Sequence, residues 1–270
     1  MTANVSPAVL SSLERLRSKQ ITYLDHLSTQ THKADQQKGL IRDNQALGER
    51  GTMCGCYSLT TPRDTLRKVL APWLANSSSS TWLNHYAPRA EIHPGEPVLA
   101  LREHQRHADV THFLWGFLAS WVKDPWRGPR PINARAETIA EKPTFRAAWR
   151  HHRCLLPSDG FYEKGQLIHR CDGEPFWLAG LWDHWIGPDG SEVETCCVIT
   201  TRANALVRPL HTRMPVIVPN GLEEAWIEEG DTTHLHALES LLNPWDPHDW
   251  CLSRALKTAS RSNPNQLQLF

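Results

Sequence analysis

The chain has 270 residues, of which 40% are hydrophobic and 21% are charged, a balance typical of a folded globular protein. No apolar run approaches the roughly 18 residues that a membrane span needs, and residues 1–30 lack the pattern of a secretory signal, so we expect a cytoplasmic protein. The formal net charge is zero, which excludes a general electrostatic attraction to nucleic acid; any contact with DNA must come from a local groove.

The cysteines are seven in number, an odd count in a chain without a secretion signal. We therefore expect free thiols and no disulfide framework. Cys196 and Cys197 would point to opposite faces of a strand and no CxxC pair is present, so we expect no metal site. Of the twelve tryptophans, most should lie in the core, and a few exposed ones could stack on unpaired bases.

The first 52 residues differ in composition from the rest of the chain. Val9–Leu27 could form a polar helix, and Ser28–Arg50 is rich in Gln, Thr and Lys and cannot compensate the entropy of ordering. We interpret residues 1–52 as a loosely structured leader, residues 53–260 as one domain, and residues 261–270 as a frayed tail.

The domain alternates short apolar runs with Pro and Gly. The runs expected to be strands are Pro97–Leu101, Thr195–Thr200 and Met214–Val218. The segments expected to be helices are Pro62–Leu74, Lys142–Arg150, Leu222–Glu228 and His234–Leu242. Short strands mixed with scattered helices predict an α+β domain with mainly antiparallel pairing.

Four short stretches carry reactive side chains: Met53–Tyr57 with Cys54, Pro131–Thr138 with Asn133 and Arg135, Pro157–Glu163 with Glu163, and Arg208–Pro215 with His211 and Arg213. Each alone also fits an ordinary turn or strand end. A histidine between two arginines, however, is disfavoured electrostatically unless an anion is present. Together the stretches supply a thiol, a carboxylate, an imidazole, an amide and guanidinium groups, which suit covalent chemistry near a phosphate-bearing substrate.

In this order and spacing, the stretches resemble the SRAP family of abasic-site processing proteins. The likeness runs from Met53 to about Trp226 and includes the blocks Trp115–Phe117, Asn133–Thr138, Arg153–Pro157, Gly180–Trp182 and His211–Pro215. The resemblance implies a single α+β domain with a mainly antiparallel, twisted, barrel-like sheet and flanking helices. It also implies a DNA-repair enzyme, associated with the SOS response, that works as a monomer without a cofactor and shields abasic sites in single-stranded DNA by a covalent protein–DNA crosslink.

The resemblance assigns roles to particular residues. The catalytic group it implies is Cys54, Asn133, Glu163 and His211. The DNA contacts it implies are Arg135 and Arg213, which look like phosphate-binding residues. Trp115 and Trp121 could pack against displaced bases, although both fit equally well as core tryptophans.

An N-terminal cysteine matters because its amine and thiol together can close a thiazolidine ring on the aldehyde of an abasic sugar. Here Cys54 follows a leader, so its amine is bound in a peptide bond. We expect translation to begin at Met53 with removal of that methionine, in preference to cleavage of the leader, for example by the protein itself. Three further residues depart from the usual family pattern, namely Cys56, His85 and Lys164.

Two other functions fit part of the sequence. An N-terminal-nucleophile amidohydrolase also uses a Cys-Gly start, but the stretches around Asn133 and His211 have no role in it. A non-catalytic binder of single-stranded DNA or of modified bases would leave Cys54 structural. Glutaminase activity without a crosslink would favour the first, and equal affinity for intact and abasic DNA without a covalent product would favour the second.

Overall fold

The computed structural model describes residues 55–74, 86–104, 106–125 and 128–254. The expectations for the leader, for the helix over Val9–Leu27, for the tail, and for Cys54 and His85 fall outside these residues. No helix within the described ranges is long and apolar enough to cross a membrane.

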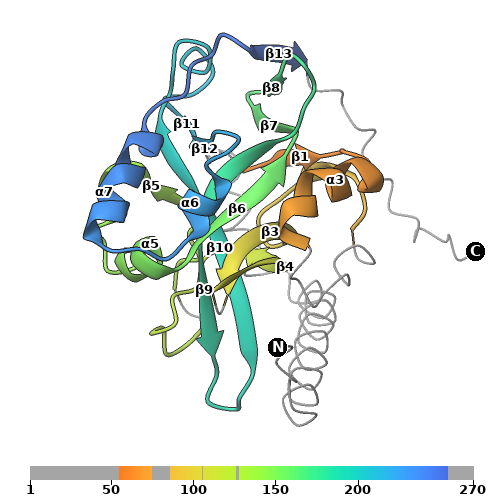
Figure 1. Cartoon of the computed structure of the whole chain (residues 1–270). Coiled ribbons are helices and arrows are strands. Elements are labelled where there is room, and N and C mark those ends of the chain that lie inside the picture. Colours follow the sequence, from red (N-terminus) through yellow and green to blue (C-terminus); the bar gives the residue numbers. More distant parts are fainter. Residues whose placement is uncertain (1–54, 75–85, 105, 126–127, 255–270) are drawn as a thin grey trace, which may run out of the picture.

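Strands dominate the chain (Figure 1). They are β1 (Tyr57–Leu59), β2 (Arg89–Ile92), β3 (Pro97–His104), β4 (His107–Trp115), β5 (Asn133–Arg135), β6 (Arg153–Ser158), β7 (Gly160–Glu163), β8 (Gln166–Arg170), β9 (Phe176–Ile186), β10 (Glu192–Arg202), β11 (Arg213–Pro215), β12 (Ile217–Val218) and β13 (Trp250–Arg254). The helices are α3 (Arg63–Leu74), α5 (Arg146–His151), α6 (Glu223–Ile227) and α7 (Thr232–Glu239), with short 3₁₀ turns η1 (Ala136–Thr138) and η2 (Ser240–Leu242).

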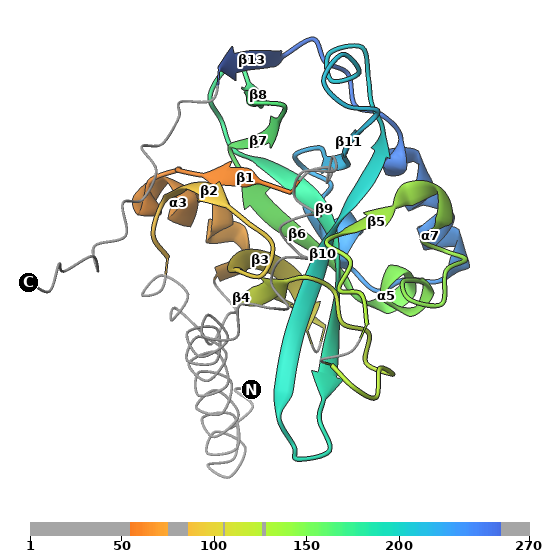
Figure 2. The same cartoon turned by 180° about the vertical axis from the view of Figure 1, so that it is seen from behind.

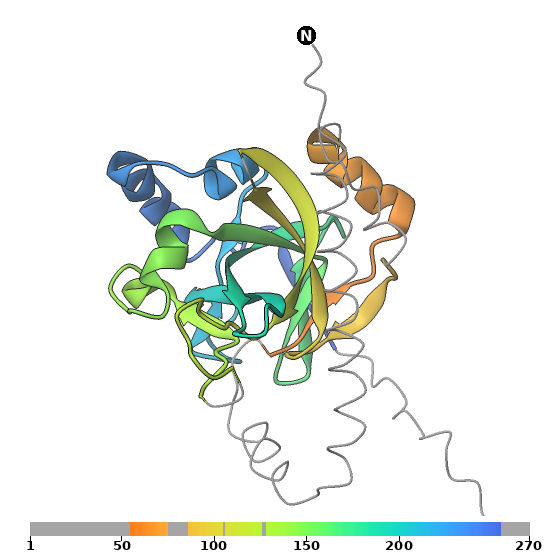
Figure 3. The ribbon, with the colours of Figure 1, turned by 90° about the horizontal axis from the view of Figure 1, so that it is seen from below.

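Five of the strands close into a barrel. The pairing runs from β10 to β4, β3, β6 and β9, and β9 then pairs with β10 over Gly180–Ile186. Every contact in this ring is antiparallel except that between β10 and β4. Figure 3 looks along the barrel, with the green and blue helices on one side and the orange helix α3 on the other. A second sheet, in the order β13-β8-β7-β1-β2, lies beside the barrel.

Strands β6 and β9 are buried on both faces for most of their length, whereas β4 mixes buried residues with partly exposed ones. All six residues of β6 are buried, as are the first eight of β9. Gly180 on β9 packs closely against the neighbouring strand β6. A Cβ atom there would lie 2.7 Å from Cδ1 of Leu156 and 2.8 Å from Sγ of Cys154, so a larger residue would push the strands apart.

The segments expected to be strands contain strands and those expected to be helices contain helices, so the α+β class is confirmed. The strand expected at Met214–Val218 is instead two strands, because β11 pairs with β10 whereas β12 pairs with β9, and the backbone changes partners at Val216. The helix expected from Lys142 begins only at Arg146, since Pro143 follows Lys142 and the intervening residues form a turn.

Strand β1 is fixed in place by one carboxylate on the turn between β6 and β7. Asp159 accepts five hydrogen bonds: one from the hydroxyl of Ser58, and two each, from the backbone N–H and the hydroxyl, from Thr60 and Thr61. Because β1 also pairs with β7, the chain just before β1 is held next to the end of β7.

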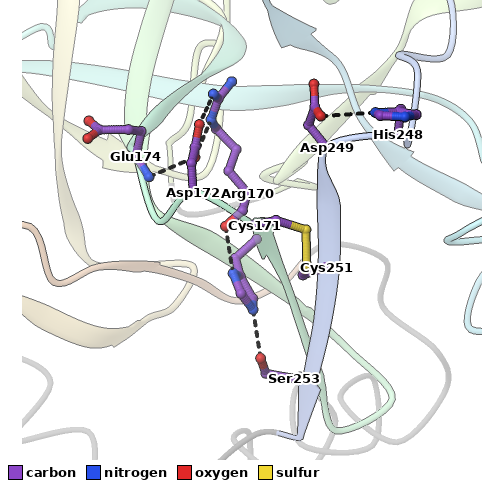
Figure 4. Close-up of a disulfide and its surroundings, with 9 residues drawn as sticks. Arg170, Cys171, Asp172, Glu174, His248, Asp249, Cys251 and Ser253 are labelled. Carbon is purple, nitrogen blue, oxygen red and sulfur yellow. Dashed lines mark hydrogen bonds and ion pairs between the residues drawn. A yellow bond between two sulfur atoms is a disulfide. The ribbon is translucent and has the colours of Figure 1, made fainter.

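The expectation that all thiols are free is wrong for one pair. Cys171 and Cys251 form a disulfide that joins the end of β8 to β13 across 80 residues of chain (Figure 4). Next to it, Arg170 pairs with Asp172, and Ser253 of β13 is hydrogen-bonded to His169 of β8. An odd number of cysteines does not reveal such a pair, because only the antiparallel pairing of β8 with β13 brings the two distant residues together.

Candidate active site

Strand β10 is the neighbour shared by two of the four reactive stretches. On one edge it pairs in parallel with β5, which places Asn133 opposite Val198 and Arg135 opposite Thr200. On the other edge it pairs with β11, which places Arg213 opposite Arg202. Figure 2 shows β5 beside β10. The stretches around Asn133 and His211 are thus brought together although they are far apart in the sequence.

The side chains share one face because residues directly opposite each other in a sheet point the same way. Val198 lines a small cavity together with Tyr57 and Phe161 of the second sheet. By alternation, Thr200 and Arg202 lie on the face of β10 that carries Val198, and so do their partners on β5 and β11.

The stretch that contains Glu163 belongs to the second sheet and borders the same cavity. Phe161 of β7 lines the cavity, so Glu163, two residues further on, lies on the same face of that strand. Glu163 is buried, with 7% of its surface exposed. The register therefore places Asn133, Arg135 and Arg213 beside the C-terminal end of β10, here called the barrel mouth, and Glu163 on the face of β7 that lines the same cavity.

Cys54 itself lies outside the described residues, and the structure begins at Gly55. The backbone N–H of Tyr162 donates to the carbonyl of Cys56 at 3.0 Å, which extends the β1–β7 ladder by one residue beyond Tyr57. One further step of this register places Gly55 opposite Glu163. The described chain thus starts beside the carboxylate that the sequence assigned to catalysis.

His211 precedes β11 and has a defined hydrogen bond. The backbone N–H of Arg213 donates to its Nδ1 at 3.1 Å. Nδ1 is therefore an acceptor, so the neutral imidazole carries its proton on Nε2. The ring is half-buried and can offer the Nε2–H group as a hydrogen-bond donor.

The guanidinium of Arg213, which the resemblance assigns to phosphate binding, forms several hydrogen bonds within the protein. Its Nη1 and Nη2 donate to the two carboxylate oxygens of Glu137 at 2.9 and 2.7 Å, and Nη2 also donates to the carbonyl of Thr200 at 2.6 Å. Hydrogen bonding to Arg213 is the main cause that lowers the pKa of Glu137 below its usual value. Glu137 was not predicted as a site residue, and only its place in the Asn133–Thr138 block pointed to it.

The two tryptophans proposed as stacking residues differ completely in exposure. Trp115 is 1% exposed, its indole donates to the carbonyl of Ile132 at 2.9 Å, and it packs on Tyr57, so its assignment to DNA contact is wrong and it belongs to the core. Trp121 is 62% exposed, and its role in stacking stays a prediction.

The free cysteines among the described residues are poor nucleophiles. Burial, with a smaller contribution from Glu91, raises the pKa of the Cys56 thiol to about 12. Burial likewise raises the pKa values of Cys154, Cys196 and Cys197. Since a thiolate is the reactive form, none of these four is poised for chemistry near neutral pH. Within the same ranges, no group of three or more His, Cys, Asp or Glu residues is arranged to hold a metal ion.

Comparisons with known proteins identify the family of the chain. The sequence model of the SOS response associated peptidase (SRAP) family matches residues 53–258. Abasic site processing protein YoqW from Bacillus subtilis (strain 168) is 32% identical over 206 residues, which cover 73% of this chain and 89% of the relative. Abasic site processing protein YoaM from the same organism is 35% identical over 173 residues, which cover 61% and 76%. A crystal structure of a protein from Bacteroides thetaiotaomicron superposes with a TM-score of 0.64 at 27% identity, over 74% of this chain and 91% of that one. The chain therefore belongs to the SRAP family.

Proposed function

We propose that this protein processes abasic sites in single-stranded DNA by forming a covalent bond between Cys54 and the abasic sugar. The observation that carries the proposal is the strand register, which sets Asn133 and Arg213 beside the end of β10 and Glu163 opposite Gly55, where the described chain begins. The names of the relatives YoqW and YoaM, both abasic site processing proteins, support the substrate.

The chemistry requires the amine and the thiol of one N-terminal cysteine. An abasic sugar exists partly as a ring-opened aldehyde. The neutral amine of Cys54 attacks the aldehyde carbon and water leaves, which gives an imine; the thiol then adds to the imine carbon and its proton passes to the nitrogen, which closes a thiazolidine. An α-amine has an ordinary pKa of about 7.7–8.0, so a useful fraction is neutral near neutral pH.

Elimination supports Cys54 as the nucleophile. Of the seven cysteines, Cys171 and Cys251 are joined in a disulfide. Cys56, Cys154, Cys196 and Cys197 have thiols whose pKa values are raised by burial. Cys54 is the remaining one.

Glu163 and His211 are proposed to assist the proton transfers of ring opening and imine formation. Glu163 is buried beside the start of β1, where a carboxyl group can exchange a proton with an incoming amine or with the sugar hydroxyl. His211 is better suited to donate a hydrogen bond from Nε2, because Nδ1 already accepts one. Asn133 would orient the sugar or the amine through its amide.

Several finer points belong to the same proposal. The protein would act as a monomer on single strands, in the cytoplasm and at the nucleoid when bound to DNA. Its reaction with abasic DNA would include lyase-type chemistry. Cleavage of the Met53–Cys54 bond, by the protein or during maturation, would free the amine that the thiazolidine requires.

The test is a denaturing gel with an oligonucleotide that contains one abasic site. We expect a shifted band for a chain that begins at Cys54, none for the 270-residue chain with Met1 confirmed by intact mass, and none for Cys54→Ala. Cys56→Ala is the matched control and should keep the band. A shifted band from Cys54→Ala at wild-type intensity, or from the uncleaved chain, would contradict the mechanism. Glutamine hydrolysis without a band would favour the amidohydrolase.

A further inference from the structure

The connection between β10 and β11 carries His211 and is shaped by one buried side chain. Asn204 is 8% exposed, and its Oδ1 accepts hydrogen bonds from the backbone N–H groups of Leu206 and Val207 at 3.1 and 3.0 Å. The carbonyl of Val207 in turn accepts a hydrogen bond from the backbone N–H of His211 at 2.9 Å. The amide oxygen of Asn204 therefore holds together the turn that leads to His211.

The nitrogen of the same amide binds a segment near the C-terminal end of the described chain. Nδ2 of Asn204 donates to the backbone carbonyl of Trp245 at 3.1 Å. The indole of Trp245 donates to the carbonyl of Pro215, the last residue of β11, at 3.2 Å. Residues 243–249, here called the strap, thus contact the chain both before and after His211.

The strap is fixed at its other end by β13. The ring centroids of Trp245 and Trp250 lie 4.3 Å apart, and Trp250 packs against Phe176 of β9 at 4.7 Å. Strand β13 pairs with β8 and is joined to its end by the disulfide, which Figure 4 shows next to Asp249 at the end of the strap. The strap is therefore a support that is anchored outside the site.

The position of Asn204 requires an amide side chain. Its oxygen accepts two hydrogen bonds from the turn, and its nitrogen donates one to the strap. A carboxylate at this position could accept from the turn, but it has no proton to donate to the carbonyl of Trp245. An alanine could serve neither side. Aspartate and alanine variants therefore separate the turn contact from the strap contact.

We propose that Asn204 is a positioning residue for the crosslinking reaction, and that it couples the strap to the turn that places His211. The proposal rests on the proposed function, in which His211 assists proton transfer. The imidazole is oriented from both sides, since the backbone N–H of His211 binds Val207 and its Nδ1 accepts from the N–H of Arg213. A displaced turn would move Nε2 away from the substrate, and a misplacement of about 1 Å can cost about 100-fold in rate. Neither Asn204 nor Trp245 was predicted as a site residue from the sequence.

The test measures single-turnover crosslinking of an abasic single-stranded oligonucleotide by the chain that begins at Cys54. We expect Asn204→Ala to lower the maximal rate by about 10- to 100-fold, with the half-saturating DNA concentration within about twofold of wild type. Asn204→Asp, which keeps the turn contact alone, should lie between the two. Asn243→Ala is the matched control and should react like wild type, since Asn243 is an exposed strap residue whose amide donates locally to the carbonyl of Ser240. A wild-type rate in Asn204→Ala would overturn the proposal, and a wild-type rate in Asn204→Asp would remove the strap from it.

A double-mutant cycle separates positioning from a general loss of structure. If Asn204 acts through His211, then Asn204→Ala should slow the His211→Gln protein far less than it slows the wild type. Equal losses in the two backgrounds would overturn the proposal. Urea unfolding of each variant ensures that the rates are compared at a temperature at which all of them are folded.

A spectroscopic measurement completes the design without DNA. In protein labelled with ¹⁵N-histidine, the Nδ1 resonance of His211 is the one that His211→Gln removes, and it reports the hydrogen bond from the N–H of Arg213. Asn204→Ala should shift this resonance and Asn243→Ala should not; an unmoved resonance in Asn204→Ala would contradict the coupling. Because this readout needs no crosslink, a wild-type protein that failed to react would refute the proposed function and not the positioning of His211.

Discussion

Replacement of Asp159 by alanine tests how the second sheet holds the start of the domain. The carboxylate accepts five hydrogen bonds, but they do not count equally. Thr60 is exposed and can bind water instead, and the Ser58 hydroxyl has a second acceptor in the carbonyl of Gly160. Thr61 is only 8% exposed and loses the acceptor of both its N–H and its hydroxyl. Each hydrogen bond to a charged group contributes about 1.5–3 kcal/mol, but water or a second acceptor replaces part of this at Thr60 and Ser58. We therefore expect Asp159→Ala to lower the free energy of unfolding by about 3 kcal/mol.

Urea unfolding followed by tryptophan fluorescence measures this loss. At a slope of about 2 kcal/mol per molar, the midpoint should fall by about 1–2 M. Asp159→Asn is the matched variant, since its amide can turn its oxygen toward Thr61 and its NH₂ toward Ser58, and it should lose about 1 kcal/mol. A loss below about 1 kcal/mol in Asp159→Ala would show that β1 is fixed by strand pairing alone.

Three further outcomes follow from the structure. The double variant Cys171→Ser/Cys251→Ser should lose up to about 4 kcal/mol of stability, the upper range for a loop of 80 residues, and should no longer respond to reductant in urea unfolding, as the wild type does. Trp121→Ala should weaken binding to single-stranded DNA by roughly 5- to 100-fold without changing the unfolding midpoint, whereas Trp115→Ala should cost about 3–5 kcal/mol of stability; the reverse pattern would contradict the burial argument. Glu137 has a folded-state pKa below the ordinary 4.5, so its ion pair stabilises the protein above that value and is lost as the pH falls through the folded pKa. The stability difference between wild type and Glu137→Gln should therefore be present at pH 6 and vanish in acid, and a difference that persists in strong acid would point to another cause.

The sequence predicted elements well where the signal is local. Runs such as Thr195–Thr200 consist of β-branched residues and cysteine, and β10 forms there. The reactive stretches were also identified from local order and spacing. Strand β5 was not predicted, because it has only three residues beside prolines and becomes a strand only by pairing with β10.

Long-range pairing could not be predicted from the sequence. The ion pair between Glu137 and Arg213 joins residues 76 apart, and no local pattern indicated it. Trp115 and Trp121 lie six residues apart in similar surroundings, yet one ends β4 inside the barrel and the other is in an exposed connection. Burial of this kind depends on which strands close around a side chain.

The dependence of the site on β10 makes the chain unequally tolerant of insertions and deletions. The turn between β9 and β10 lies beyond Ile186 and before Glu192, far along the strand from the residues at the mouth, so its length can vary with little effect on them. One extra residue between Val198 and Thr200 would instead turn every following side chain of the strand to the opposite face. Arg202 would then point away from Arg213, and Arg135 would lose its partner Thr200, in a single step. Natural length variation in relatives should accordingly fall in the hairpin tip and be absent from the last five residues of β10.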